Sequence, residues 1–345
     1  MVSISLCMIV KNEQAVIERC LESIYKFVDE IIIIDTGSTD KTKEICEKYA
    51  NVYDFEWCDD FSKARNFSFS KANCDYIMWL DADDIVPDKT LKKLMNWKQQ
   101  NDNNADVVML PYKLNDNFIY YRERILKREK GFVWQGAVHE CIQPSGKIIY
   151  LDAVIEHHKI KNNSDRNLKI YEKNEDKLDT RGKFYYAREL LTHGYIDKAI
   201  KMFEIFLEDK NAWLENKLEA YRNLASCYIC KSEFNKAKEL LIKSLELDIP
   251  RAETCCDLAM IYIKLNKYNQ AKFWYETAYK CIPDTQNGGF ISLDCYGYLP
   301  CIGLCVCYDK LGDKKSANYW NERAGVFKPD SKAVIFNRKY FNSLK

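Results

Sequence analysis

Residues 76–84 have the sequence Tyr-Ile-Met-Trp-Leu-Asp-Ala-Asp-Asp. A short continuous apolar run of this kind is typical of a strand buried in a parallel sheet. The run stops at three carboxylates in four positions, and open α/β sheets bind their ligands at the carboxyl ends of strands. Asp81 and Asp83 could converge on one divalent cation, which prefers oxygen ligands and is often shared with substrate phosphates. Taken alone, the same residues would also suit a solvated acidic turn, so the surrounding sequence has to decide.

Strands and helices alternate on both sides of this run. Residues 4–10 and 31–34 are apolar runs typical of buried strands, and apolar residues at helical spacing occupy 16–25 between them. Further helices are expected at 41–50 and 90–100, and further strands at 107–110, 118–121 and 153–158. Alternation of this kind indicates βαβ units. We therefore expect an α/β fold with a mostly parallel sheet and helices on both of its faces.

Asp35 follows the run at 31–34 in the same way that Asp81 follows its own strand. A carboxylate at this position can accept hydrogen bonds from a ribose or a base N–H, as the acidic residue of dinucleotide-binding folds does. Gly37 would allow the backbone to turn tightly beside a ligand. An ordinary loop with a helix-capping aspartate is the alternative. Neither the glycine pattern of a Rossmann dinucleotide site nor that of a P-loop occurs in the sequence.

Arg65 stands where the pattern predicts the start of a helix, just before the central run. An arginine there could bind a diphosphate together with the positive end of the helix. The alternative is a surface arginine without a role. A second basic group lies further along the chain and is interpreted as a solvated face or as the rim of an anionic site; its members are Arg122, Arg124, Lys127, Arg128 and Lys130.

His139, His157 and His158 are three of the chain's four histidines, and they fall in two short segments. A single histidine often has only a structural role. Neutral imidazole is nevertheless a good additional ligand for a metal that carboxylates already hold. These histidines are therefore candidates for the same site as Asp81 and Asp83.

The composition limits the classes of function. With 345 residues the chain is long enough for two domains. Its 52 basic and 51 acidic residues leave a net charge of +1, so no overall field attracts nucleic acid or an anionic membrane. No apolar run approaches the length of a transmembrane helix, and the N-terminal residues lack the features of a signal peptide. We expect a soluble cytoplasmic protein that has no transmembrane segment and binds no nucleic acid.

The fifteen cysteines are expected to be structural thiols. A chain of this size without an export signal does not resemble a disulfide scaffold. Cys227 and Cys230 form a Cys-x-x-Cys pair inside a predicted helix, but no second pair and no histidine occur at zinc spacing. The cysteine count therefore bears on the cellular compartment and not on function.

The second half of the chain has a repeat. Small residues recur with a period of 34, as from Ala225 to Ala259 and from Ala237 to Ala271. This is the period of tetratricopeptide (TPR) repeats, in which small residues let paired helices approach closely. The next copy places Ala317 46 residues after Ala271, which predicts an inserted loop near 283–294. We expect domains at 1–165 and 166–330, followed by a C-terminal tail at 331–345.

Five blocks of the first half, in this order, resemble family 2 glycosyltransferases of the GT-A fold; they lie at 8–13, 34–40, 60–66, 79–84 and 134–140. The resemblance covers residues 2–160. Together with the repeats, it is similar to bacterial peptide S- and O-glycosyltransferases that carry a C-terminal TPR region, such as those that modify glycopeptide bacteriocins of the sublancin type. Lipopolysaccharide-core glycosyltransferases share several of the same blocks.

The resemblance implies inverting transfer from a nucleotide-diphosphate sugar, usually a UDP-sugar, with Mg²⁺ or Mn²⁺. By position in the matching blocks, Asp35 would hold the uridine, Arg65 the nucleotide or diphosphate, and Asp81 the ribose or sugar. Asp83 would bind the metal. His157, with His158 as its rival, would complete the metal shell or contact the diphosphate. The remaining donor-site residues implied are Val10, Asn12, Glu13, Ala82 and Trp134.

Inverting displacement also needs a base beside the acceptor nucleophile. Glu140 is the first candidate, followed by Asp84 and His139. The acceptor expected from the resemblance is a cysteine or a serine or threonine side chain of a peptide or protein. The repeats could recruit that acceptor or form a homodimer. The alternatives are an acceptor among cell-envelope saccharides, and a non-catalytic TPR scaffold.

Overall fold

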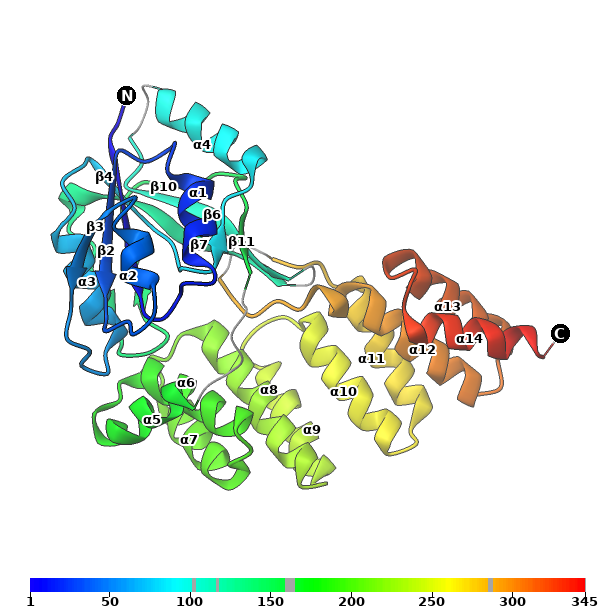
Figure 1. The fold of residues 1–345 in the computed structure, drawn as a ribbon. Helices are drawn as coiled ribbons and strands as arrows, with labels where there is room; N and C mark the ends of the chain where they lie inside the picture. The colour runs from blue at the N-terminus through cyan, green and yellow to red at the C-terminus, as the bar shows by residue number, and fades with distance from the viewer. Residues whose placement is uncertain (101–103, 116–117, 159–164, 285–287, 345) are drawn as a thin grey trace. The chain divides into compact units, whose positions relative to one another are not determined.

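The computed structural model describes residues 1–100, 104–115, 118–158, 165–284 and 288–344. It divides the chain into two compact units, Met1–Gly182 and Lys183–Lys345 (Figure 1). Helix α5 (Arg166–Lys173) belongs to the first unit, where the Tyr171 hydroxyl donates a hydrogen bond to the carbonyl of Val138. The domain boundary expected at 165/166 remains a prediction. The two units are described separately below.

Within the described residues, nine strands of the first unit form one mixed sheet. Its order is β3-β2-β1-β4-β7-β6-β11-β5, and β10 pairs with β6. The strands are β1 (Ile4–Val10), β2 (Glu30–Asp35), β3 (Asn51–Asp54), β4 (Tyr76–Trp79), β5 (Asp84–Ile85), β6 (Val107–Asn115), β7 (Phe118–Lys127), β10 (Ile148–Tyr150) and β11 (Ile155–His157). The four strands from β3 to β4 are parallel, whereas β7 runs antiparallel to both β4 and β6. A separate two-stranded sheet pairs β8 (Trp134–Gln135) with β9 (Cys141–Ile142).

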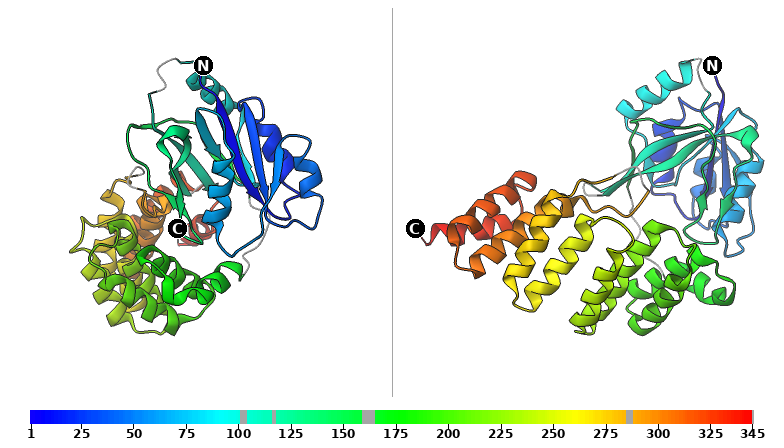
Figure 2. Two further views of the ribbon diagram at one scale, coloured as in Figure 1. Left: turned by 90° about the vertical axis from the view of Figure 1, so that its left-hand side faces the viewer. Right: turned by 180° about the vertical axis from the view of Figure 1, so that it is seen from behind.

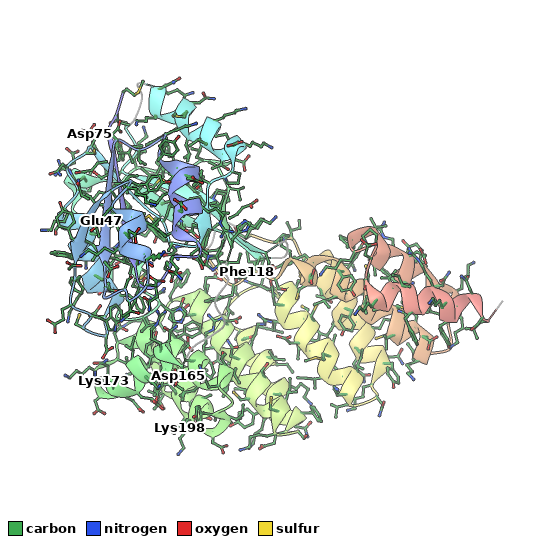
Figure 3. The ribbon with its side chains drawn as sticks, in the orientation of Figure 1. Glu47, Asp75, Phe118, Asp165, Lys173 and Lys198 are labelled. Atoms are coloured by element: carbon green, nitrogen blue, oxygen red, sulfur yellow. The ribbon has the colours of Figure 1, made fainter. Side chains whose placement is uncertain are left out.

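Helices cover both faces of the sheet, as expected, because alternate residues of the central strands are apolar on both sides. On one face, Leu6 and Met8 of β1 pack in a core with α1 (Ile17–Ile24) and α4 (Asp88–Gln99). On the other face, Cys7 packs with residues of β2 and with aromatic side chains of α3 (Phe61–Ser70). The short helix α2 (Thr42–Cys46) follows β2 and ends earlier than the expected range of 41–50. Asp75 (Figure 3) fastens the start of β4 to β1, because its carboxylate accepts hydrogen bonds from the amide and hydroxyl of Ser3.

Two expectations for the basic residues are corrected by the strand and helix boundaries. Asp60 caps α3 by accepting a hydrogen bond from the Lys63 amide, so the helix begins at Phe61 and Arg65 lies one turn inside it, buried. The strand expected at 118–121 continues to Lys127, which places Arg124 in the middle of the sheet. Arg124 is fully buried and does not belong to a solvated face.

The second unit is a stack of helix pairs, as the 34-residue period predicts. The pairs are α6 (Thr180–Thr192) with α7 (Ile196–Glu208), α8 (Leu214–Cys230) with α9 (Phe234–Ser244), α10 (Ala252–Lys264) with α11 (Tyr268–Lys280), and α12 (Tyr298–Lys310) with α13 (Lys314–Phe327). The right-hand view of Figure 2 shows the pairs side by side. The recurring alanines Ala225, Ala237, Ala259 and Ala271 are all buried between helices. The segment predicted as a tail forms α14 (Lys332–Asn342), whose Val334 is fully buried.

All fifteen cysteines are free thiols. Burial raises the pKa of Cys46 and of Cys255 to about 12, so these thiols stay protonated and act as small apolar side chains. Cys227 is buried and Cys230 is exposed, so the Cys-x-x-Cys pair does not present a joint site. Cys58 is the other exposed thiol. In the described part of the chain, none of the helices has both the length and the apolar character needed to span a bilayer.

Candidate active site

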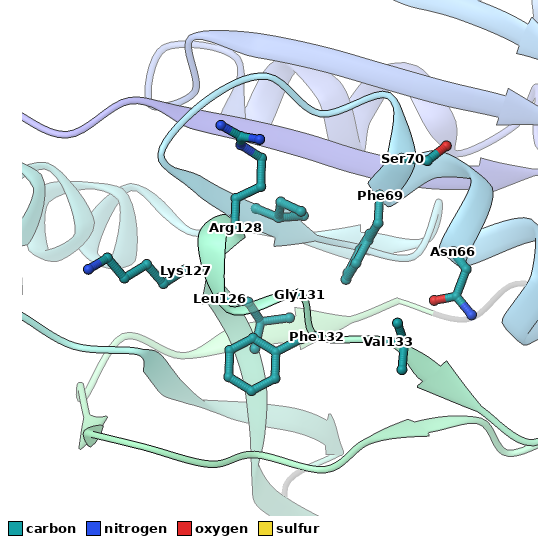
Figure 4. A pocket seen from close by; sticks show the side chains of 10 residues that line it. Asn66, Phe69, Ser70, Leu126, Lys127, Arg128, Gly131, Phe132 and Val133 are labelled. Atoms are coloured by element: carbon teal, nitrogen blue, oxygen red, sulfur yellow. The ribbon is translucent and has the colours of Figure 1, made fainter.

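A pocket of about 670 Å³ opens where β1, β2 and β4 end. Every residue that lines it belongs to the first unit. Nine of the predicted site residues line it, and they are Val10, Glu13, Arg65, Asp81, Ala82, Asp83, His139, Glu140 and His157. A second pocket of about 240 Å³ (Figure 4), lined by residues such as Phe69, Leu126 and Phe132, contains none of the predicted site residues.

The buried side chain of Asp84 stabilises the acidic turn that contains Asp81 and Asp83. Its side chain is fully buried, and its Oδ2 accepts hydrogen bonds from the Asp81 backbone amide at 3.0 Å and from Arg124 Nη1 at 3.0 Å. The turn closes with a hydrogen bond from the Asp84 amide to the Asp81 carbonyl. Asp84 does not line the pocket, so this geometry supports a positioning role and not contact with an acceptor.

Arg124, which forms the ion pair with Asp84, lies between two aromatic rings. Its guanidinium carbon lies 3.8 Å from the ring centre of Trp79 and 4.2 Å from that of Tyr112. Its Nε and Nη2 are buried and have no hydrogen-bond partner, so the ring faces provide the electrostatic stabilisation on those sides. A buried ion pair of this kind depends on both of its members.

Arg65 links the two halves of the pocket wall. Its Nη2 lies 2.7 Å from Asp81 Oδ1, and its Nε lies 2.6 Å from Glu140 Oε1. Burial opposes ionisation of Asp81, but the charges of Arg65 and Arg124 outweigh it and lower the pKa of Asp81 to about 2. Trp134 lies under the guanidinium at 4.7 Å, which explains why it is buried and does not itself line the pocket.

Asp83, Asp84 and His157 form the group of three metal-type ligands found among the described residues, with candidate ligand atoms all within 4.8 Å of one another. His157 Nδ1 lies 3.4 Å from Asp83 Oδ1 and 2.8 Å from the Tyr112 hydroxyl. Burial, reinforced by Asp81 and Asp84, raises the pKa of Asp83 above its usual value. Carboxylate oxygens with one imidazole suit a divalent cation, so these residues fit the metal that was expected.

The rival histidine points elsewhere. His158 Nε2 lies 3.0 Å from Glu156 Oε2, and the side chain does not line the pocket. Its backbone amide donates to the Asp83 carbonyl at 2.9 Å. Of the two adjacent histidines, it is therefore His157 that faces Asp83.

Asp35 presents an unsatisfied acceptor. Its Oδ1 accepts the amides of Gly37 and Ser38 at 2.8 and 2.7 Å, whereas its buried Oδ2 has no hydrogen-bond partner. Gly37 has a φ of +97°, which its lack of a side chain allows. Asn12 braces the same loop, because its Oδ1 accepts the Thr39 amide at 2.7 Å. Neither Asp35 nor Asn12 lines the main pocket.

Ten pocket residues were not predicted, and they are Ile9, Lys11, Thr36, Trp57, Phe61, Trp79, Arg122, Val138, Arg166 and Asn167. Lys11, Trp57 and Phe61 lie in or beside the conspicuous sequence blocks, so their neighbourhood could have indicated them. Arg166 and Asn167 lie in α5, beyond residue 160, where no motif marked them. Their placement depends on the fold, since α5 packs against the loop that carries His139 and Glu140.

Residues 5–156 match the family model of glycosyl transferase family 2. The first unit is therefore similar to family 2 glycosyl transferases. Residues 252–285, which contain α10 and α11, match the tetratricopeptide repeat model. The fold expected from the sequence, a GT-A-like mixed sheet followed by TPR-like helices, is confirmed.

Several curated proteins are similar to part of this chain. A TPR repeat-containing protein of Synechococcus elongatus is 35% identical over 147 residues, covering 42% of this chain and 36% of that protein. The SPbeta prophage-derived glycosyltransferase SunS of Bacillus subtilis is 33% identical over 138 residues, covering 38% of this chain and 33% of SunS. The glycosyltransferase GlyG of Streptococcus pneumoniae is 34% identical over 115 residues, covering 30% of this chain and 37% of GlyG. The chain thus spans about a third of the length of these relatives.

Among solved structures, a thermophilic TPR protein of Thermus thermophilus is similar with a TM-score of 0.38 and 15% identity, over 52% of this chain and 89% of that one. A similarity at this level adds nothing to the assignment of function.

Proposed function

We propose that the chain is an inverting, metal-dependent glycosyltransferase that moves a hexose from a UDP-sugar to a side chain of a peptide or protein. The observation that carries the proposal is the convergence, in one pocket, of Asp83 and His157 with the Arg65–Asp81 pair. The family 2 match over the same residues supports it.

Departure of a nucleoside diphosphate requires stabilisation of the negative charge that develops on it. Arg65 is held in place by Asp81 and Glu140 and faces the pocket, so it can bind the diphosphate without reorganising. Asp83 and His157 would hold the divalent cation, with Asp84 behind them. A cation bound there supplies Lewis-acid stabilisation of the leaving phosphate.

The nucleotide base would be recognised by Asp35. Its buried Oδ2 lacks a partner, and an unpaired buried acceptor costs free energy that a donor from a ligand would recover. The N–H of a uracil ring is such a donor. Val10, at the end of β1, and Glu13, on the loop that follows it, line the pocket.

The acceptor must be deprotonated by a group that reaches the pocket. Glu140 and His139 both line it, whereas Asp84 does not. Glu140 is ion-paired with Arg65, so it becomes available to an acceptor only when the pair loosens. We retain Glu140 as the first candidate and His139 as the second. A thiol acceptor would need less help from either than a hydroxyl would.

The proposed peptide or protein acceptor is supported by the TPR repeat and by the similarity to SunS. A cell-envelope saccharide is the second candidate, since the minor teichoic acid biosynthesis protein GgaB of Bacillus subtilis is 32% identical over 88 residues. Labelling expressing cells with a radioactive hexose distinguishes the two acceptors, because the label is then sought in peptides and in envelope glycans. Label recovered only in envelope polymer would favour the second candidate.

The test of the proposed activity is release of UDP from a panel of UDP-sugars, with Mn²⁺ or with EDTA. We expect release with one donor, its loss in EDTA, and its loss in Asp83→Ala. Asp88→Ala, an exposed aspartate in the first turn of α4, is the matched control and should behave as wild type. Release that survives both EDTA and Asp83→Ala would contradict the metal role.

A further inference from the structure

The connection between α11 and α12 contains a described segment, residues 288–296, that lies on the helical repeats and is called the strap below. It includes a 3-10 turn, η3, at Leu293–Tyr296. Figure 1 shows the strap in orange, running back from α12 past α10. It belongs to the insertion that the lengthened repeat period predicted near 283–294, part of which lies outside the described residues.

The second half of the strap is anchored on α10. Glu253 is only 3% exposed, and both of its carboxylate oxygens accept hydrogen bonds from the strap. Oε1 accepts the Ser292 amide at 2.8 Å, and Oε2 accepts the Tyr296 hydroxyl at 2.8 Å. Because an unpaired buried carboxylate is costly, these bonds fix the register of the strap on α10.

The first half of the strap contacts α6, which lies two helix pairs before α10 in the stack. The guanidinium carbon of Arg188, on α6, lies 4.4 Å from the ring centre of Phe290, and the ring of Phe184 lies 5.8 Å from it. Phe290 also borders a small pocket on α8 together with Glu215 and Arg222, where only about 20 Å³ remain open. A single strap therefore contacts α6, α8 and α10.

These helices form one continuous face. Within the stack, α8 contacts α10 and α10 contacts α12, so the first helices of successive pairs lie side by side. Repeat proteins present such extended faces as binding surfaces, and each repeat otherwise contacts only its neighbours. In this chain the strap already lies on that face. Its Phe290 ring packs against the guanidinium of Arg188, and the backbone amide of Ser292, two residues later, donates a hydrogen bond to Glu253.

We propose that the strap is an internal occupant of the partner-binding face of the repeats. The partner that fits this face is a polypeptide segment with an aromatic side chain at the position of Phe290. Such a partner binds when it displaces the first half of the strap. This inference does not depend on the proposed transferase activity.

The competition favours the strap for a physical reason. A segment tethered by a short linker acts at an effective concentration in the millimolar range. A free peptide with the same contacts is therefore outcompeted, since its apparent affinity is reduced by the fraction of molecules whose face is open. Weakening the contacts of the strap must raise the affinity for the peptide.

The test uses a fluorescent peptide of residues 288–296, with Cys295 replaced by serine, and measures its anisotropy with the full chain. We expect Phe290→Ala to bind it at least about tenfold more tightly than wild type, because the competing ring is gone. Phe273→Ala, which alters a ring on α11 that is 58% exposed, is the control and should bind as wild type does. Adding Arg188→Ala to Phe290→Ala should abolish the gain, since it removes the cation that holds the ring.

Equal binding by wild type and Phe290→Ala, or a gain that persists without Arg188, would overturn the proposal. If Phe290→Ala loses its helical circular dichroism, Phe290→Leu takes its place with the same criteria. A folded variant that binds no peptide at all would also overturn it, because the face would then be no receptor.

Discussion

At the scale of single residues, Asp84 stabilises the acidic turn without lining the pocket. Its carboxylate receives hydrogen bonds from Arg124, from the Tyr112 hydroxyl and from the Asp81 amide. The three donors come from β7, β6 and the turn itself. Loss of the charge on Asp84 would therefore act on the fold and the site together.

Asp84→Asn should lower the free energy of unfolding by about 3–5 kcal/mol, because it leaves the buried charge of Arg124 without a counterion. Urea denaturation measures this loss. Asp54→Asn, which breaks the pair between Lys43 and the exposed Asp54, should leave the free energy of unfolding nearly unchanged and serves as the control. Similar losses in the two variants would show that the Asp84–Arg124 pair has no special weight.

The pKa of Glu30 predicts how the stability of the protein depends on pH. Burial opposes its ionisation, but hydrogen bonds from Ser5 and Asn73 outweigh burial and lower the pKa of Glu30 below its usual 4.5. A carboxyl group whose pKa is lower in the folded state than in the unfolded state stabilises the folded protein at pH values above the unfolded pKa. This stabilisation is lost as the pH falls through the folded pKa.

Glu30→Gln should therefore be less stable than wild type at pH 7, and the difference should shrink as the pH falls below 4.5. Urea denaturation of both proteins at several pH values measures the difference. A difference that does not change with pH would contradict the prediction.

The sequence was informative about residues that follow buried strands. Asp81, Asp83 and Asp35 could be named because each stands where an apolar run ends. The pairings could not be named, since nothing local indicates that Arg65 meets Glu140, 75 positions away. The aromatic cage of Arg124 was missed for the same reason: Trp79 and Tyr112 come from different strands, and a basic residue in a basic cluster suggests solvent.

At the scale of elements, close helix packing makes Gly303 a sensitive position. Gly303 lies in α12, and a Cβ atom there would come within 2.3 Å of the Tyr275 ring on α11. The ring is packed in the core of the repeats, so it has little room to move.

Gly303→Ala should destabilise the protein by about 1–3 kcal/mol through overpacking. Gly325→Ala is the matched control in α13, because its Cβ comes closest to the flexible end of Arg338. Thermal unfolding of both variants measures the contrast. A Gly303→Ala protein as stable as the Gly325→Ala protein would contradict the close approach.

Helices and strands were predicted best where a long sequence repeat was present and where capping or turn residues marked their ends. The helix pairs follow from the 34-residue repeat, whereas β6 and β7 were expected to be half their length. The parts that were not predicted, 111–115 of β6 and 122–127 of β7, contain Tyr, Lys and Arg, which weaken the apolar signal. Each of them pairs with the predicted part of the other strand. Pairing with a neighbouring strand extended them beyond what local sequence indicates.

At the scale of the whole molecule, the family match ends before the pocket does. The match stops at residue 156, yet Arg166 and Asn167 of α5 line the pocket. Tyr171 and Arg181 also hold the loop of Val138 and His139 through hydrogen bonds to its carbonyls. The pocket is therefore built from more of the chain than the family match covers.

A protein of residues 1–182 should bind UDP in the presence of Mn²⁺ as the full chain does. A protein of residues 1–158 should bind it about tenfold more weakly, a loss of roughly 1.4 kcal/mol. Titration calorimetry measures both affinities, and circular dichroism checks that each protein is folded. Equal affinity of two folded proteins would show that α5 adds nothing to the pocket.

The two exposed thiols give this chain a pair of built-in attachment points. Cys58 belongs to the first unit and Cys230 to the second, while the other thirteen thiols are buried or half-buried. Maleimide dyes or spin labels should therefore react first at these two positions, without engineered substitutions. Energy transfer between the labels then measures any change in the distance between the two units as nucleotide, metal or peptide is added.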